Sequence, residues 1–314
     1  MRKSNSFSLW LAQIRANFLL LAVLLVAIGL AISYKYQTPG ISFDWFHSVL
    51  ILIGVVSAHI SVNLFNEYSD FKTKIDFNTK RTPFSGGSGI LVEGLISPHK
   101  VLRVAIANLV LALAIGVYFA LTKHWTIIAI SALGALTIVY YTKILARYLL
   151  GELFAGLTLG SLVVIGTYIV MNASPEYNLY GLLPKEVILI SIPPGILTSL
   201  LLLLNEFPDA EADKKGGRRH LVIRFGYRIS AIIYTAGLIL TFGTIALLPI
   251  MGYSSLWLFI ALLPLPLAFK ASLIALKFNG DFKKLIPALM SNVIIVLTTN
   301  LLITIGILLD ISYY

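Results

Sequence analysis

The stretch Leu201–Gly226 reads LLLLNEFPDAEADKKGGRRHLVIRFG, and in it a run of leucines ends abruptly in acids and then in bases. A charged side chain inside a lipid bilayer costs on the order of a few kcal/mol or more, so such residues tend to face polar cavities and mark working sites. Asn205, Asp209 and Asp213 are four residues apart, which on a helix places them along one stripe. The stretch therefore predicts a polar site at the mouth of an apolar helix.

The composition places this helix in a membrane. The chain has 314 residues, of which 58% are hydrophobic and 12% charged, with a mean hydropathy of +0.89. Soluble domains have about 45–50% apolar and about 25% charged residues. Long apolar runs predict an all-α polytopic protein, because a barrel shows alternating segments of about ten residues. The chain has no cysteine, which excludes a disulfide framework, a thiolate nucleophile and a cysteine-based metal site.

The apolar runs predict a single domain over residues 1–314, with transmembrane helices around a central cavity. At about 20 apolar residues per span, the sequence predicts nine helices, near residues 17–34, 46–68, 101–121, 125–143, 151–171, 185–205, 228–250, 255–276 and 286–308. Residues 1–16, before the first span, fit either an interfacial amphipathic helix or a disordered tail.

The formal net charge of +10 is distributed very unevenly along this topology. With nine spans, the N-terminus and the loops after the even-numbered spans share one side. That side carries all but three of the 24 Lys and Arg residues, since the other side keeps only Lys35, Lys123 and Lys185. The asymmetry predicts cytoplasmic cap loops on a multi-pass protein of the cell membrane. The basic charge thus reflects topology and argues against nucleic acid as a partner.

The acidic stretch has a counterpart four spans earlier. The second span closes with Asn63, Asn66, Glu67 and Asp70, and Asp76 follows. The words NEYSD and NEFPD share one pattern, Asn-Glu-aromatic-x-Asp. Such a duplication is expected of two helical halves that face each other across one cavity.

Carboxylate and amide oxygens are hard ligands that suit Mg²⁺, which is often shared with substrate phosphates. The bases beside the two acidic clusters would hold the remaining phosphate oxygens. The pattern therefore predicts a diphosphate site at the membrane surface, and the alternative is that these residues are ordinary loop charges that cap helix ends. Asp76 lies six residues after Asp70, about 600° of helix, so we expect the helix to end near Lys72 to Lys74.

The two clusters also carry a resemblance. The clusters read Asn66-x3-Asp70-x5-Asp76 and Asn205-x3-Asp209-x3-Asp213, and a basic loop follows each of them. This pattern resembles the two Asp-rich motifs of the UbiA-type intramembrane aromatic prenyltransferases. Three further segments are similar to the family's stretches around these motifs: RTPFSGGSGILVEGLISP at 81–98, YYTKILARYLLGE at 140–152 and RRHLVIRFG at 218–226. The resemblance covers nearly the whole chain.

The resemblance implies transfer of a polyprenyl group from its diphosphate to an acceptor, usually an aromatic ring. It implies Mg²⁺ held by Asp70, Asp76, Asp209 and Asp213, with Asn66 and Asn205 assisting. The departing diphosphate would be neutralised, and an allylic cation would attack the ring inside a dry cavity. Lys143 and Arg147 join the four aspartates as catalytic candidates, although both also fit a positive-inside anchor. Candidate contacts to the diphosphate or the acceptor are Asn63, Asn66, Lys72, Arg81, Asn205, Lys214, Arg218 and Arg219.

The acceptor is indicated by finer features. The x5 spacing before Asp76, the GGSG stretch and the pair Gly151-Glu152 resemble 1,4-dihydroxy-2-naphthoate polyprenyltransferases of menaquinone synthesis more than 4-hydroxybenzoate enzymes. 4-Hydroxybenzoate, homogentisate and glyceryl phosphate stay open as alternative acceptors. A cation-coupled transporter also carries intramembrane acids in repeated halves. Its acids lie near the midplane, however, whereas here they lie at predicted cytoplasmic helix ends.

Several other features have two interpretations each. His59 is either a buried imidazole or an acceptor contact, and His220 is either a general base or a solvated loop residue. The glycine-rich turn at 86–89 fits a phosphate cradle or a lid over the cavity. The proline pair at 193–194 is expected to break or kink the sixth span.

Overall fold

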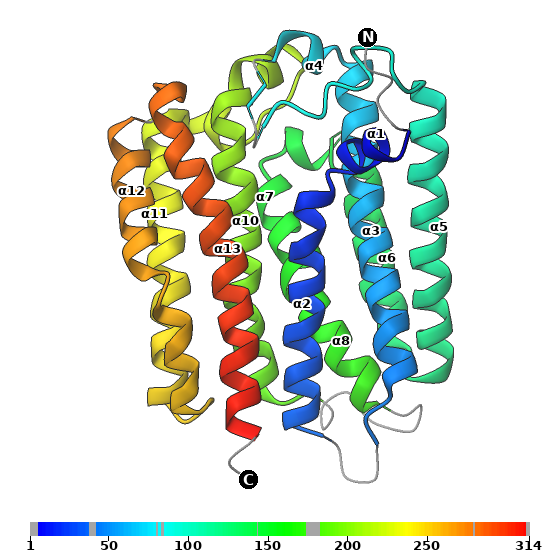
Figure 1. Ribbon diagram of the computed structural model, residues 1–314, viewed down its shortest axis with the longest axis vertical. Coiled ribbons are helices and arrows are strands. Elements are labelled where there is room, and N and C mark those ends of the chain that lie inside the picture. Colours follow the sequence, from blue (N-terminus) through cyan, green and yellow to red (C-terminus); the bar gives the residue numbers. More distant parts are fainter. Residues whose placement is uncertain are drawn as a thin grey trace.

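The computed structural model describes residues 6–37, 42–79, 81–82, 85–142, 144–173, 183–278 and 280–311. The long helices run side by side along the long axis of one bundle (Figure 1). Over the described ranges the chain forms helices and their connections, and no strand. The expectation of an all-helical fold is therefore confirmed for this part of the chain.

The first half of the chain consists of α1 (Ser6–Gln13), α2 (Ala16–Lys35), α3 (Trp45–Lys72), α4 (Ile75–Asn78), α5 (Pro98–Thr122) and α6 (Thr126–Tyr140). Next come η1 (Leu145–Arg147), α7 (Gly151–Gly156), the π-helical turn η2 (Leu157–Ser161) and α8 (Leu162–Asn172). The second half consists of α10 (Lys185–Lys215), α11 (Leu221–Ile250), η3 (Leu256–Leu262), α12 (Leu265–Lys277) and α13 (Phe282–Ile311). The bundle is thus built from long helices joined by short ones.

The described part of the chain has eight helices that are long and apolar enough to cross a membrane. They span residues 16–35, 45–72, 98–122, 151–172, 185–215, 221–250, 256–277 and 282–310. The remaining predicted span, α6, is apolar but has only 15 residues. Such a helix rises about 22 Å, less than the bilayer core of about 30 Å. The chain is therefore a multi-pass membrane protein, and the count of nine spans stays a prediction.

The second acidic motif lies on a single long helix. The proline pair does not break α10, which runs from Lys185 to Lys215, so a break is excluded and a kink stays a prediction. Hydroxyl groups from α10 and its neighbour bond to carbonyl groups beside the prolines: Ser161 Oγ donates to Ser191 O at 2.9 Å, and Thr198 Oγ1 donates to Pro194 O at 2.8 Å. The first bond joins η2 to α10 beside the prolines, and the second lies within α10. The motif helix therefore continues past the predicted end at residue 205.

The first acidic motif is divided as expected. Helix α3 ends at Lys72, Lys74 adopts a left-handed φ of 60°, and α4 starts at Ile75. The predicted break near Lys72 to Lys74 is therefore confirmed. The left-handed residue turns the chain back, so that the short α4 caps the end of the bundle (Figure 1).

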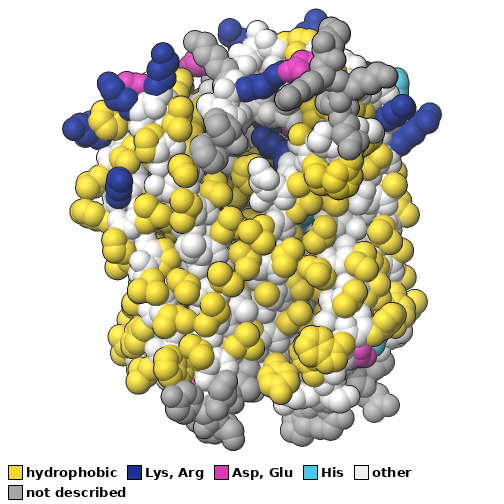
Figure 2. Space-filling view, in the orientation of Figure 1, with side chains coloured by type: hydrophobic (Ala, Val, Ile, Leu, Met, Phe, Trp, Pro, Cys, Tyr) yellow, Lys and Arg dark blue, Asp and Glu magenta, His cyan; other side chains and the backbone are white. Residues whose placement is uncertain are grey.

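Charged side chains gather at the end of the bundle that carries α4. Figure 2 shows Lys and Arg concentrated there, while hydrophobic side chains cover the middle of this face. At the opposite end, Lys35 Nζ lies 2.5 Å from Asp310 Oδ2 and joins the ends of α2 and α13. This distribution agrees with the predicted sidedness, and the assignment of the charged end to the cytoplasm stays a prediction.

The N-terminal segment forms a helix that packs on the bundle. Trp10 and Ile14 contact the hydrophobic cluster that contains Leu64 and Val101, whereas Phe7 is exposed. Of the two interpretations for residues 1–16, a helix is observed over Ser6–Gln13. Its contact with a membrane surface stays a prediction, as does the single-domain organisation of residues 1–314.

Candidate active site

A polar cavity lies at the charged end of the bundle, between α3, α4 and α10. All six predicted metal ligands line it, namely Asn66, Asp70, Asp76, Asn205, Asp209 and Asp213. The wall also includes Arg218, Tyr141 and the turn Ser85 to Gly87. The structure thus brings together two motifs that lie more than 120 residues apart in the chain.

Helix α4 brings Asp76 into the cavity. Its side chain is only 4% exposed, and its Oδ2 has no hydrogen-bond partner among the described residues. Burial raises the pKa of Asp76 most strongly, and together with the nearby carboxylates of Asp70 and Glu67 it brings this pKa to about 8. A buried acid without a partner is costly. Asp76 is therefore suited to bind a cation.

Helix α10 presents the second motif along one face. Asn205, Asp209 and Asp213 all line the cavity, as their four-residue spacing predicts. Among the described residues, Asn205 Oδ1 and Asp209 Oδ1 have no hydrogen-bond partner, like Asp76 Oδ2. The donor set is composed of carboxylate and amide oxygens, which are the ligands that Mg²⁺ prefers.

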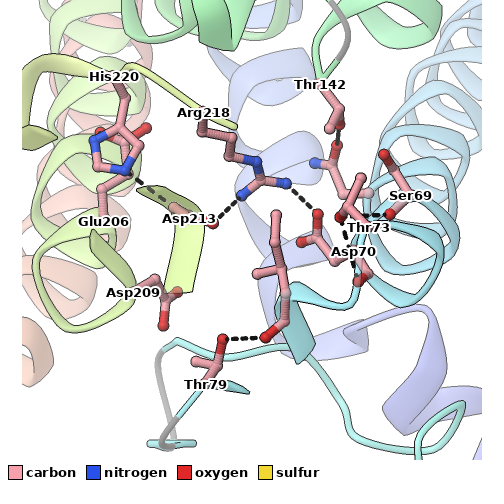
Figure 3. Close-up of polar contacts among 12 residues, drawn as sticks. Ser69, Asp70, Thr73, Thr79, Thr142, Glu206, Asp209, Asp213, Arg218 and His220 are labelled. Atoms are coloured by element: carbon pink, nitrogen blue, oxygen red, sulfur yellow. Dashed lines mark hydrogen bonds and ion pairs between the residues drawn. The ribbon is translucent and has the colours of Figure 1, made fainter. Parts of the chain in front are cut away.

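Arg218 joins the two motifs. Its Nη1 donates to Asp213 Oδ1 at 2.8 Å, and its Nη2 donates to Asp70, as Figure 3 shows. Burial disfavours the charged guanidinium, but the carboxylates of Asp70 and Asp213 outweigh this effect and raise the pKa of Arg218. Arg218 therefore neutralises one acid from each half of the chain.

A second buried cluster lies behind Asp213 and was not predicted from the sequence. His220 is 1% exposed, its Nε2 lies 3.2 Å from Asp213 Oδ2, and its Nδ1 lies 3.4 Å from Glu206 Oε2. Glu152 Oε1 accepts the backbone N–H of Leu221 at 2.9 Å. The interpretation of His220 as a solvated loop residue is therefore wrong. In the sequence, only the position of His220 shortly after the second acidic motif pointed to a role in the site.

Several predicted site residues lie away from the cavity wall. Lys72, Arg81, Arg147, Lys214 and Arg219 are exposed. Arg81 pairs with Glu93 at 3.1 Å, and Asn63 Nδ2 donates to the carbonyl of Ile14 at 2.9 Å. Lys143 lies outside the described residues. Roles in substrate binding or catalysis for these seven residues stay predictions.

A second, apolar cavity lies deeper in the bundle, among α3, α5, α6, η2 and α8. Its wall includes Ile51, Gly54, Val55, Gly116 and Phe119. His59 also lines this cavity, and its Nδ1 lies 3.0 Å from the carbonyl oxygen of Val55. The imidazole is buried, which agrees with the first of the two interpretations given for His59. Helix α3 therefore contributes to both cavities, with its acids at one end and small or apolar residues further along.

The chain is similar to known proteins over most of its length. A sequence model of the UbiA prenyltransferase family matches residues 36–293. Over 219 residues the chain is 32% identical to the 1,4-dihydroxy-2-naphthoate octaprenyltransferase of Bacillus subtilis strain 168, covering 69% of this chain and 67% of that protein.

Solved structures share the fold. The apo structure of a UbiA homolog from Aeropyrum pernix K1 has a TM-score of 0.69 at 15% identity, and covers 93% of this chain and 98% of that one. The structure of a UbiA homolog from Archaeoglobus fulgidus bound to GPP and Mg²⁺ has a TM-score of 0.60 at 17% identity, and covers 94% and 99%. At such identities the likeness shows the fold alone.

Proposed function

Because the chain belongs to the UbiA prenyltransferase family and is a membrane-embedded prenyltransferase, we propose that it transfers a polyprenyl group from its diphosphate to 1,4-dihydroxy-2-naphthoate. The reaction would depend on Mg²⁺ and belong to menaquinone biosynthesis. The main support is the convergence of both acidic motifs on one polar cavity. The name of the Bacillus subtilis relative supports the acceptor, and the GPP and Mg²⁺ of the Archaeoglobus fulgidus homolog support the donor and the metal.

The residues around the polar cavity fit Mg²⁺. Three buried oxygens, on Asp76, Asn205 and Asp209, have no hydrogen-bond partner among the described residues. Asp70, Asp213 and Asn66 complete the proposed ligand set. When bound, Mg²⁺ would supply positive charge to the diphosphate leaving group. The carboxylates would orient that charge towards the cavity, where water is limited and electrostatic interactions are stronger.

The protein's own groups would bind and orient the substrates. Arg218 carries a forked guanidinium at the cavity wall, and such a group suits phosphate oxygens. The apolar cavity along α3 would hold the prenyl tail and keep water from the reactive carbon. In the transfer the C–O bond to the diphosphate breaks, and the diphosphate keeps the electron pair. A C–C bond then forms at the ring carbon, which loses its carboxyl group as CO₂.

The charged end of the bundle would face the cytoplasm of the cell membrane, since Lys and Arg gather there (Figure 2). Both substrates would then reach the polar cavity from that side. The diphosphate would be released to the same side.

An acceptor panel tests the proposal. Purified protein is given a polyprenyl diphosphate, Mg²⁺ and one acceptor at a time, and the products are identified by mass spectrometry. We expect a prenylated, decarboxylated naphthalene ring, and no product after chelation of the metal. Turnover only with 4-hydroxybenzoate, homogentisate or glyceryl phosphate would contradict the acceptor assignment. Absence of diphosphate release with every acceptor would contradict the activity.

A further inference from the structure

Glu67, the residue after Asn66 of the first motif, connects three separate segments. Its carboxylate is 3% exposed, and it accepts the backbone N–H of Ser88 at 2.8 Å and the Ser88 hydroxyl at 2.6 Å. Gln13 Nε2 donates to it at 3.1 Å, and Arg15 Nε lies 3.7 Å away. One buried carboxylate on α3 thus binds both the N-terminal segment and the loop between α4 and α5, which we call the cap loop.

The cap loop carries a glycine turn that touches an acid from each half of the chain. The backbone N–H of Gly86 donates to Asp209 Oδ2 at 3.1 Å. A Cβ added to Gly87 would lie 2.9 Å from Asp76 Oδ1. The φ angles of Gly86 and Gly87 are +85° and +68°, so both positions favour glycine. This turn is therefore part of the wall between the two acidic clusters.

We propose that Glu67 is a positioning residue of the prenyl-transfer site, which holds the Gly86–Gly87 turn at the mouth of the polar cavity through its bonds to Ser88. Backbone N–H groups in such a turn are good donors to phosphate oxygens. The Gly86 N–H, which now donates to Asp209, would donate to the diphosphate once that carboxylate engages another group. The role in diphosphate binding rests on the proposed function, whereas the fixing of the turn is independent of it.

The second half of the chain repeats the arrangement. Glu206 directly follows Asn205, is 6% exposed, and lies 3.4 Å from Nδ1 of His220. His220 is in the segment just after its motif, as Ser88 is in the segment after the first. The glutamates shared by NEYSD and NEFPD therefore both lie next to a residue of the segment that follows their motif, Glu67 through hydrogen bonds and Glu206 through a 3.4 Å contact. This common placement favours a positioning role for Glu67.

The test compares Glu67→Ala, Glu67→Gln and Ser88→Ala in the full-length protein, with Glu211→Ala as control. Glu211 is an exposed acid on α10 that lies outside the polar cavity lining. Hydrogen exchange of the backbone amides at 85–91 is measured without substrate. We expect Glu67→Ala to speed this exchange about tenfold or more, because the loop loses its anchor. Glu67→Gln keeps an acceptor for the Ser88 N–H, and Ser88→Ala removes only one bond, so both should change exchange by about threefold.

Steady-state kinetics then separate positioning from chemistry. We expect Glu67→Ala to raise KM for the polyprenyl diphosphate about tenfold with a smaller fall in kcat, and Glu67→Gln to restore most of the loss. Unchanged exchange in both Glu67→Ala and Ser88→Ala would overturn the proposal, and so would an unchanged KM with a large fall in kcat. Should Glu67→Ala fail to fold, Glu67→Gln and Ser88→Ala decide by the same readouts. Faster exchange in a protein whose wild type shows no transfer would leave the positioning intact and refute the proposed function.

Discussion

The Arg218 guanidinium donates a 2.8 Å hydrogen bond to Oδ1 of Asp213, five residues earlier in the chain. The same guanidinium also donates to Asp70 of the first motif. The Arg218 guanidinium therefore lies between Asp70 and Asp213, two of the proposed Mg²⁺ ligands, and neutralises both carboxylates. Arg218 and Mg²⁺ should compete for these carboxylates, and this competition can be measured.

We predict that Arg218→Ala lowers thermal stability in Mg²⁺-free buffer, by an amount equivalent to about 3 kcal/mol, because it leaves two buried acids without their cation. Added Mg²⁺ should then raise Tm more in the variant than in the wild type. Prenyl transfer should still fall, because the guanidinium proposed to contact the diphosphate is lost. Thermal unfolding across a Mg²⁺ titration provides the measurement.

Arg218→Lys is the matched control for charge. It keeps a cation but loses the planar fork, so we expect it to recover much of the stability and little of the activity. An equal response of wild type and Arg218→Ala to Mg²⁺ would show that the arginine and the metal do not share these acids.

Asp70→Ala and Asp209→Ala should each reduce kcat by about 10²–10³, because each removes charge stabilisation of the leaving group. Glu211→Ala is the control, since Glu211 is exposed on the same helix as Asp209 but does not line the polar cavity. Rates are measured at saturating Mg²⁺. Full turnover in either aspartate variant would remove that residue from the proposed metal-binding set.

Gly87→Ala should impair activity more than Gly94→Ala, although both glycines have a φ of +68°. The added methyl group would meet Asp76 at residue 87, whereas nothing lies within 4 Å of it at residue 94. Both substitutions carry a similar backbone strain, about 1–2 kcal/mol. A difference in KM for the polyprenyl diphosphate therefore reports the contact with Asp76. Equal effects in the two variants would mean that backbone strain alone is responsible.

Gly160→Ala should destabilise the bundle without touching the polar cavity. A Cβ there would lie 2.7 Å from the Cα of Gly195, where η2 packs closely against α10. We expect a loss of about 1–3 kcal/mol, since backbone cannot move aside easily. Gly243→Ala on α11 is the control, because its Cβ would meet nothing within 4 Å. Similar Tm values for the two variants would contradict this close packing.

Local sequence rules predicted the acidic motifs well. The six-residue spacing between Asp70 and Asp76 required a break in the helix, and the structure has one, with Lys74 in a left-handed conformation. The four-residue spacing of Asn205, Asp209 and Asp213 predicted one stripe, and all three line the cavity. Both results follow from helix geometry alone.

Contacts between segments that lie far apart in the chain could not be predicted from helix geometry. Residue 67 had no assigned role because its partners, Gln13 and Ser88, lie far away in the chain. The charge of Arg81 predicts a contact with the diphosphate, and the ion pair that Arg81 forms with Glu93, twelve residues later, could not be predicted from that charge. The hydrophobic pattern also predicted a full membrane span for α6, like the other spans, although α6 has only 15 residues and is the shortest of the nine candidates.

Helix α3 carries Asp70 at one cavity and Gly54 at the other, sixteen residues apart, or about 24 Å along the helix axis. If the diphosphate of a substrate lies near Asp70, the length of its prenyl tail decides whether the tail end reaches Gly54. Tail length would then be selected by the bulk of side chains near Gly54, where an added methyl group would press on Ile115. Evolution could therefore change the preferred isoprenoid without altering the groups that cleave the diphosphate.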